Sequence, residues 1–204
     1  MHRVRDETEI YTNYLTSEFD ELNSIFYEYR GKEITDDLIS DVIQYVIFMY
    51  LNGYQSVSYM VGVDGTMEPN TKTISKAIYT IIDGKDIYDR LSEIKGKKYD
   101  DLQGQIENII RSDGHRCYVS GQMQCAKNIK SKGIRLSKTW DSVMDGKERI
   151  THHNLHGVEK EEDEYFETVN GKTKAPGQFG IPEEDCNCRC ILKYRRLYNG
   201  SYSR

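Results

Sequence analysis

Between residues 138 and 190 the sequence reads Lys138-x-Trp140, Asp145-x-x-x-Arg149-x-x-His152-x-x-Leu155-x-Gly157, Phe166, Pro176-Gly177 and Glu184-x-x-Asn187-Cys188-Arg189-Cys190. The chain changes its pattern just before this stretch. Upstream of about Gly133 apolar residues recur every three or four positions, which is typical of amphipathic helices. Downstream they alternate or are interrupted by glycine and proline, which is typical of short strands and turns. The sequence therefore predicts a mainly α N-terminal part (1–132) and a small α+β C-terminal module (133–204).

The order and spacing of these residues resemble the C-terminal module of the phage Mu F-like, or phage head morphogenesis, family, the minor head proteins of tailed bacteriophages. That module reads roughly as Lys-x-Trp, Arg-x-x-His-x-x-Leu-x-Gly, Pro-Gly and Glu-x-x-Asn-Cys-Arg-Cys. The resemblance covers residues 138–190 and weakens upstream, so it says little about the helical part. The motif comprises Lys138, Trp140, Asp145, Arg149, His152, Leu155, Gly157, Phe166, Pro176, Gly177, Glu184, Asn187, Cys188, Arg189 and Cys190.

This resemblance implies a minor capsid protein of a tailed bacteriophage or prophage that acts in head morphogenesis. Family members associate with the portal vertex inside the procapsid, and some also interact with the packaged genome and affect its delivery. The implied partner is the phage portal protein, with scaffold or capsid protein and non-specific double-stranded DNA as further candidates. The implied location is the virion interior, reached from the host cytoplasm during assembly. No enzymatic activity is expected.

Composition excludes several classes of protein. The net charge of −5 argues against a polycation that coats nucleic acid. The polar N-terminus lacks the features of a signal peptide. The most apolar run, 42–51, is about half of the roughly twenty residues that span a bilayer, so we expect no membrane contact. Five cysteines in a chain without export features favour core thiols or metal ligands over a disulfide framework.

Apolar periodicity predicts five helices in the N-terminal part. They cover about 7–30, 35–60 (with the Thr35 hydroxyl as the N-cap), 73–82, 86–94 and 100–130. Gly114 and Gly121 fall inside the last helix, where each weakens it by roughly 1 kcal/mol relative to alanine. A kink or break at these glycines is therefore compatible with the pattern.

The C-terminal module should contain a strand over 134–140, a helical turn within 148–155, a hairpin over 164–174 and a final strand over 188–198. Asn170-Gly171 predicts the turn of the hairpin, because these residues tolerate the positive φ angles that a two-residue turn needs. We expect Trp140 and Phe166 to anchor the core and Gly157 to end the helical turn.

Two clusters of residues could bind a metal: histidines at 152, 153 and 156, and cysteines at 186, 188 and 190. Zinc takes four ligands from cysteine and histidine. His152, Cys188 and Cys190 match the family pattern, so a structural zinc bound by these three is one hypothesis. The alternative is a packed, hydrogen-bonded cluster with two buried thiols.

The same residues raise the question of catalysis, since cysteine and histidine can form a nucleophile and a base. Arg149, His152 and Glu184 could also resemble a nuclease or ADP-ribosyl-transfer site. The alternative function is therefore a prophage-derived toxin or nuclease-like effector that uses His152, Cys188 and Cys190. Against it, the chain has no Gly-rich phosphate loop, no Ser-His-Asp signature and no H-E-x-x-H motif.

Charged residues suggest two further features. Asp145, Arg149 and Glu184 could form a buried network of ion pairs and hydrogen bonds. The basic C-terminal run could contact DNA, with cations on phosphates and tyrosines stacked on bases; otherwise it is only the solvent face of a strand. Its residues are Lys193, Tyr194, Arg195, Arg196 and Tyr198.

Overall fold

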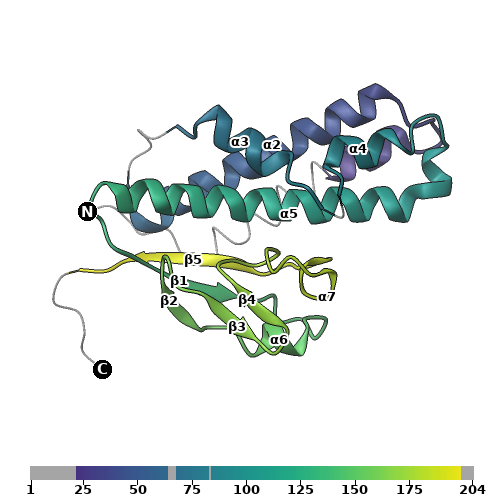
Figure 1. Cartoon of the computed structure of the whole chain (residues 1–204). Helices are drawn as coiled ribbons and strands as arrows, with labels where there is room; N and C mark the ends of the chain where they lie inside the picture. The colour runs from purple at the N-terminus through teal and green to yellow at the C-terminus, as the bar shows by residue number, and fades with distance from the viewer. Residues whose placement is uncertain (1–21, 64–67, 83, 199–204) are drawn as a thin grey trace.

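The computed structural model describes residues 22–63, 68–82 and 84–198, which form two layers (Figure 1). Helices make one layer, and the strands lie on the other side of the long helix α5 (Tyr99–Ser131). Both the mainly α N-terminal part and the small α+β module are therefore confirmed. Residues 22–29 are helical, as predicted for the end of the first helix, whereas 7–21 lie outside the described residues.

The other helices of this layer are α2 (Asp36–Val61), α3 (Thr71–Ile78) and α4 (Ile87–Ser92). Each matches a predicted helix, with shifted ends. Thr35 is the N-cap residue of α2, but its hydroxyl makes no capping hydrogen bond, so that detail of the prediction was wrong. Asn70 and Asp86 cap α3 and α4 instead, accepting hydrogen bonds from downstream backbone N–H groups. Among the described helices, none is both long and apolar enough to cross a bilayer.

Two glycines allow α2 and α5 to pack more extensively than any other pair of elements. A Cβ atom on Gly53 would lie 1.9 Å from the Tyr118 carbonyl oxygen, and one on Gly121 would lie 2.1 Å from the Tyr50 carbonyl oxygen. Any larger residue would force the two backbones apart. The break considered for α5 does not occur, since the helix runs unbroken through Gly114 and Gly121.

The main sheet has three antiparallel strands in the order β2–β1–β5: β2 (Glu159–Glu161), β1 (Leu136–Asp141) and β5 (Ile191–Arg196). A hairpin pairs β3 (Phe166–Thr168) with β4 (Gly171–Thr173), as predicted. Its two turn residues are Val169 and Asn170, because Gly171 already pairs with Thr168, so the predicted Asn170-Gly171 turn was wrong by one residue. Two short helices, α6 (Ile150–His153) and α7 (Pro182–Asp185), complete the module. Strand β5 is shorter than predicted, and neither β2 nor α7 was predicted.

Strand β5 is held against α5 by the side chain of Gln122. Its amide nitrogen donates to the Leu192 carbonyl over 2.8 Å, and its amide oxygen accepts from the Leu192 N–H over 3.2 Å. The side-chain amide thus satisfies both backbone groups of a buried strand residue. One hydrophobic cluster contains buried side chains from both predicted parts, such as Tyr118 and Trp140. The boundary near Gly133 between two domains remains a prediction.

Replacing Gly121 by alanine should destabilise the protein by about 1–3 kcal/mol, because the new Cβ would collide with α2 backbone. Gly104 is the matched control: it lies in the same helix, and a Cβ there would meet nothing within 4 Å. Gly104→Ala should therefore raise the free energy of unfolding by about 0.5–1 kcal/mol. Urea unfolding of both variants checks the prediction, which fails if Gly121→Ala is as stable as the parent.

Candidate functional site

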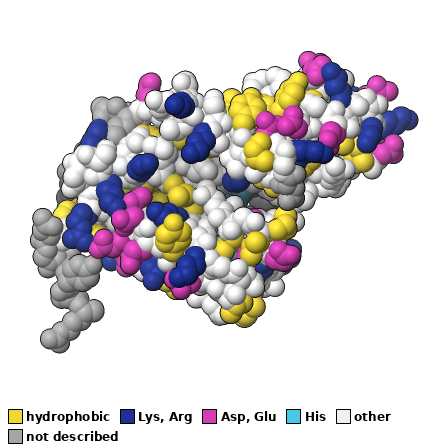
Figure 2. Space-filling view, in the orientation of Figure 1, with side chains coloured by type: hydrophobic (Ala, Val, Ile, Leu, Met, Phe, Trp, Pro, Cys, Tyr) yellow, Lys and Arg dark blue, Asp and Glu magenta, His cyan; other side chains and the backbone are white. Residues whose placement is uncertain are grey.

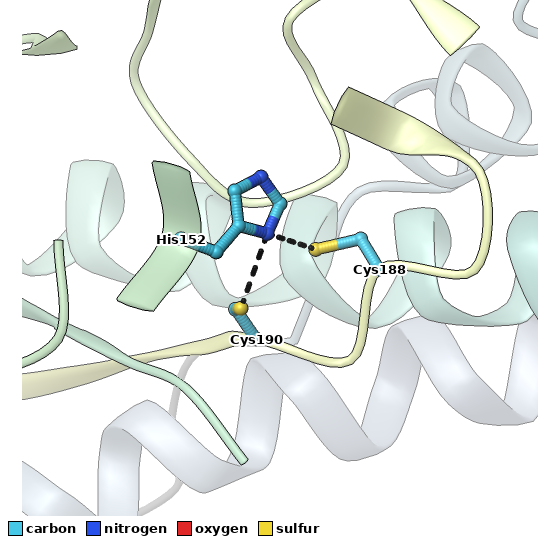
Figure 3. A group of neighbouring side chains, drawn as sticks. All are labelled: His152, Cys188 and Cys190. Carbon is cyan, nitrogen blue, oxygen red and sulfur yellow. Dashed lines mark hydrogen bonds between the residues drawn. The ribbon is translucent and has the colours of Figure 1, made fainter. Parts of the chain in front are cut away.

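The histidine and two cysteines of the motif meet in the interior (Figure 3). His152 projects from α6, and its Nδ1 atom lies 3.4 Å from Cys190 Sγ and 3.6 Å from Cys188 Sγ. Their ligand atoms all lie within 4.8 Å of one another. The remaining members of the two sequence clusters, His153, His156 and Cys186, are not part of this group. The structure thus brings together the three residues that the metal hypothesis named.

A sharp turn places both thiols beside His152. Asn187 adopts a left-handed conformation with φ of 54°, which asparagine tolerates better than most residues. Arg149 donates a hydrogen bond to the Cys186 carbonyl, and the Arg189 guanidinium binds the Asp145 carboxylate through contacts of 2.7 and 2.9 Å. These contacts explain why the Asn-Cys-Arg-Cys segment needs an asparagine and an arginine.

Glu184 of α7 is fully buried and holds the opposite side of the His152 ring. Its Oε2 atom lies 2.9 Å from His152 Nε2 and accepts a hydrogen bond from Thr151. Its Oε1 atom accepts from Asn170 over 2.8 Å and from Thr168 over 3.3 Å. Burial by itself raises the pKa of Glu184, but these hydrogen bonds and the charge of His152 outweigh it, so the pKa lies below its ordinary value.

The predicted network of Asp145, Arg149 and Glu184 is therefore wrong. Glu184 binds α6 and the β3–β4 hairpin, whereas Asp145 is exposed and pairs with Arg189. Arg149 binds a backbone carbonyl instead of a carboxylate. The partners of Glu184 were missed because Thr151, Thr168 and Asn170 are common turn and strand residues, and only folding brings them together.

The two thiols differ because of their neighbours. The hydrogen bond with Cys188 lowers the pKa of Cys190, and hydrogen bonds with His152 and Ser142 lower it further, although burial opposes the shift. The same contact with Cys190, together with burial, raises the pKa of Cys188. Ser142 Oγ lies 3.4 Å from Cys190 Sγ and donates to the His152 carbonyl over 2.8 Å. One thiol of the pair is thus favoured as the thiolate.

Helix α5 contributes a residue that the sequence did not single out. His115 is buried, and its Nε2 atom lies 2.7 Å from the Cys190 carbonyl oxygen. Burial lowers the pKa of His115, although the contact with that carbonyl opposes the shift. A Cβ atom on Gly177 would lie 2.9 Å from His115 Nδ1, and its φ of 68° also suits glycine. The Pro176-Gly177 motif therefore makes room for a histidine from the helical layer.

Other motif residues form the core around the site. Trp140 is fully buried and makes edge contacts with the rings of Phe166 and His152, at centroid distances of 5.1 and 5.2 Å. Both aromatic anchors were predicted correctly. Lys138 is also buried, donates to the Lys174 carbonyl over 2.9 Å, and has its pKa lowered to about 8 by burial. Leu155 is buried, and Gly157 follows α6 with φ of 77°.

The residues proposed for DNA contact lie on and after β5 but have other partners. Tyr194 is buried, so its expected stacking on bases was wrong. Lys193 pairs with Asp141, Arg195 pairs with Glu159, and Arg196 donates to the Gly62 carbonyl. Tyr198 is exposed. Basic and acidic side chains lie intermixed on the face shown in Figure 2. DNA contact through this run remains a prediction.

The sequence of this chain matches a known protein family. The family model described as "Phage Mu protein F like protein" matches residues 71–193, which is more than half of the chain. The chain belongs to the phage Mu protein F-like family. The match begins at α3, so the family region includes the helices α3, α4 and α5 as well as the motif recognised in 138–190.

Two curated relatives match part of the chain. The chain is 38% identical over 85 residues to the minor head protein GP7 of Bacillus phage SPP1. This match covers 41% of this chain and 27% of that protein. The chain is 34% identical over 86 residues to the NAD(+)–arginine ADP-ribosyltransferase EFV of Enterococcus faecalis, covering 42% of this chain and 18% of that protein. The matches thus span less than a third of either relative. No solved structure gives a significant match.

Glu184→Gln should lower the free energy of unfolding at neutral pH by about 2 kcal/mol, because hydrogen bonds to a charged group are lost in a buried site. Glu183→Gln is the control, since Glu183 lies in the same helix but is exposed. That variant should unfold like the parent within about 0.5 kcal/mol. Equal stability of the two variants in urea unfolding would contradict the role assigned to Glu184.

Proposed function

We propose that this chain is a minor head protein that acts in head morphogenesis of a tailed bacteriophage or prophage. The observation that carries the proposal is membership of the phage Mu protein F-like family, together with 38% identity to a minor head protein. The buried site supports a structural role, because its polar groups hold segments of the module together. Motif residues such as Trp140 and Phe166 pack in the hydrophobic core around it. In this role the chain has no enzymatic activity of its own.

The finer proposal is association with the portal protein inside the procapsid, with scaffold or capsid protein as further partners. The protein would then be located in the virion interior. Exposed apolar side chains in the helical layer support an interface with another protein, because such side chains are enriched where proteins associate. Figure 2 shows hydrophobic side chains gathered over this layer. Three lie close together in sequence around the α3–α4 connection: Tyr79, Ile81 and Tyr88.

Contact with packaged DNA has weaker support. Lys193 and Arg195 each pair with a carboxylate, which reduces the positive charge available to phosphates. If the basic run does bind double-stranded DNA, the binding should be non-specific and should weaken steeply as salt is added. We therefore place protein association ahead of DNA contact in the proposed role.

The test is co-elution of the full chain with the portal oligomer from the same genome in size-exclusion chromatography. The proposal predicts co-elution at a low molar ratio. The double variant Ile81→Asp/Tyr88→Asp should weaken the association at least about tenfold. The substitutions remove apolar contact area and add two carboxylates that would have to be desolvated in the interface.

Val169→Asp is the matched control for that measurement. Val169 is 93% exposed but lies in the β3–β4 hairpin, away from the helical layer. This variant should co-elute like the parent. Absence of association between the folded parent and a folded portal oligomer would refute the portal proposal, and equal loss in both variants would refute the proposed surface.

The second candidate function, a toxin or effector, is favoured by the match to an ADP-ribosyltransferase. That match covers 18% of the relative, whose printed activity belongs to the whole protein. Expression of this chain in bacterial cells separates the two functions. The head protein proposal predicts normal growth, whereas a toxin would arrest growth and His152→Ala would relieve the arrest in a protein that still folds.

A further inference from the structure

We propose that His152, Cys188 and Cys190 bind one zinc ion through His152 Nδ1 and the two sulfur atoms. The site lies between α6 and the turn that precedes β5, so the ion would link two segments that are far apart in sequence (Figure 3). No other group of three or more potential ligands is found among the residues that the structure describes. The inference does not depend on a role in head assembly.

The distances fit tetrahedral zinc. Zinc–sulfur bonds of about 2.3 Å and zinc–nitrogen bonds of about 2.0 Å, at tetrahedral angles, place sulfur and nitrogen about 3.5 Å apart. The measured separations from His152 Nδ1 are 3.4 Å to Cys190 Sγ and 3.6 Å to Cys188 Sγ. An imidazole nitrogen has one lone pair in the ring plane, so it cannot accept well-directed hydrogen bonds from two thiols at once. A single ion between the three atoms satisfies all of them.

The surroundings of His152 also match a metal ligand. Metal-binding histidines commonly donate their other ring N–H to a carboxylate, which fixes the tautomer and the ring orientation. Here the buried Glu184 carboxylate lies 2.9 Å from His152 Nε2, an ion-pair contact without the alignment of a hydrogen bond. Threonine and asparagine side chains hold that carboxylate in turn. With the proton on Nε2, the lone pair of Nδ1 points at the two sulfur atoms.

The fourth position opens onto a small cavity. The three ligand residues border a space of about 20 Å³, which they share with Glu148, Arg149 and Arg189. A space of roughly 10–15 Å³ suffices for one water molecule. Glu148, which borders this space, has a buried Oε2 atom without a hydrogen-bond partner among the described residues, and a water molecule in the cavity is a candidate donor to it. The zinc therefore has three protein ligands and one water ligand.

Binding requires both cysteines as thiolates. The aquated Zn²⁺ ion gives up water molecules and gains two sulfur ligands and one nitrogen ligand, while the two thiol protons leave to solvent. No oxidation or reduction is involved. The ion and the two thiolates have no net charge together, so the complex is compatible with a buried position.

The experiment measures metal content in the full chain, purified without an affinity tag under reducing conditions from medium that contains zinc. Mass spectrometry of the metal should find about one zinc per chain. The zinc content of the double variant Cys188→Ser/Cys190→Ser should be lower by a factor of at least about ten. Cys186→Ser is the matched control, because Cys186 lies in the same segment but outside the cluster, and it should keep its zinc.

Cobalt provides a readout that does not depend on the variants being folded. Adding Co²⁺ to metal-free parent protein should produce thiolate-to-cobalt charge-transfer absorption and the visible bands of a tetrahedral ion, and zinc should remove both. The proposal is overturned if folded, reduced parent protein contains no zinc and gives no cobalt bands. It is also overturned if the double variant retains the full zinc content.

Discussion

The module depends on one buried carboxylate. Glu184 carries a negative charge into the interior, where an unpaired charge would be strongly destabilising. Its two oxygens therefore fix α6 through Thr151 and His152, and the β3–β4 hairpin through Thr168 and Asn170. Because His152 is fixed in this way, its other nitrogen faces the thiols that precede β5. Helix α6, the β3–β4 hairpin and the turn before β5 thus converge on one point.

Helix α5 connects this point to the helical layer. On one side Gly121 allows α2 to approach, and on the other Gln122 and His115 bind the backbone of Leu192 and Cys190. The family match agrees with this arrangement, since it begins at α3 and includes all of α5. The family region therefore consists of the sheet module and helices α3 to α5, whereas α2, which also packs on β5, lies outside it.

Local patterns predicted most of the fold. Apolar periodicity located every described helix of the N-terminal part, and Asn170-Gly171 located the hairpin to within one residue of its turn, because these signals depend on residues close in sequence. Strand β2 was missed because its Glu159-Lys160-Glu161 sequence has no apolar alternation and exists through pairing with β1. Spacing also identified His152, Cys188 and Cys190. The partner of Glu184 was predicted wrongly, since Arg149 offers the same chemistry as His152 and only the tertiary fold decides between them.

A role in head assembly and a zinc ion in the module are compatible, because a rigid centre preserves the surface that a partner would bind. The central claim is that the motif's histidine and cysteines form a metal centre supported by Glu184. X-ray absorption at the zinc edge of the purified full chain tests it most directly. The account predicts two sulfur neighbours at about 2.3 Å and two nitrogen or oxygen neighbours at about 2.0 Å. A zinc spectrum without sulfur neighbours would contradict it.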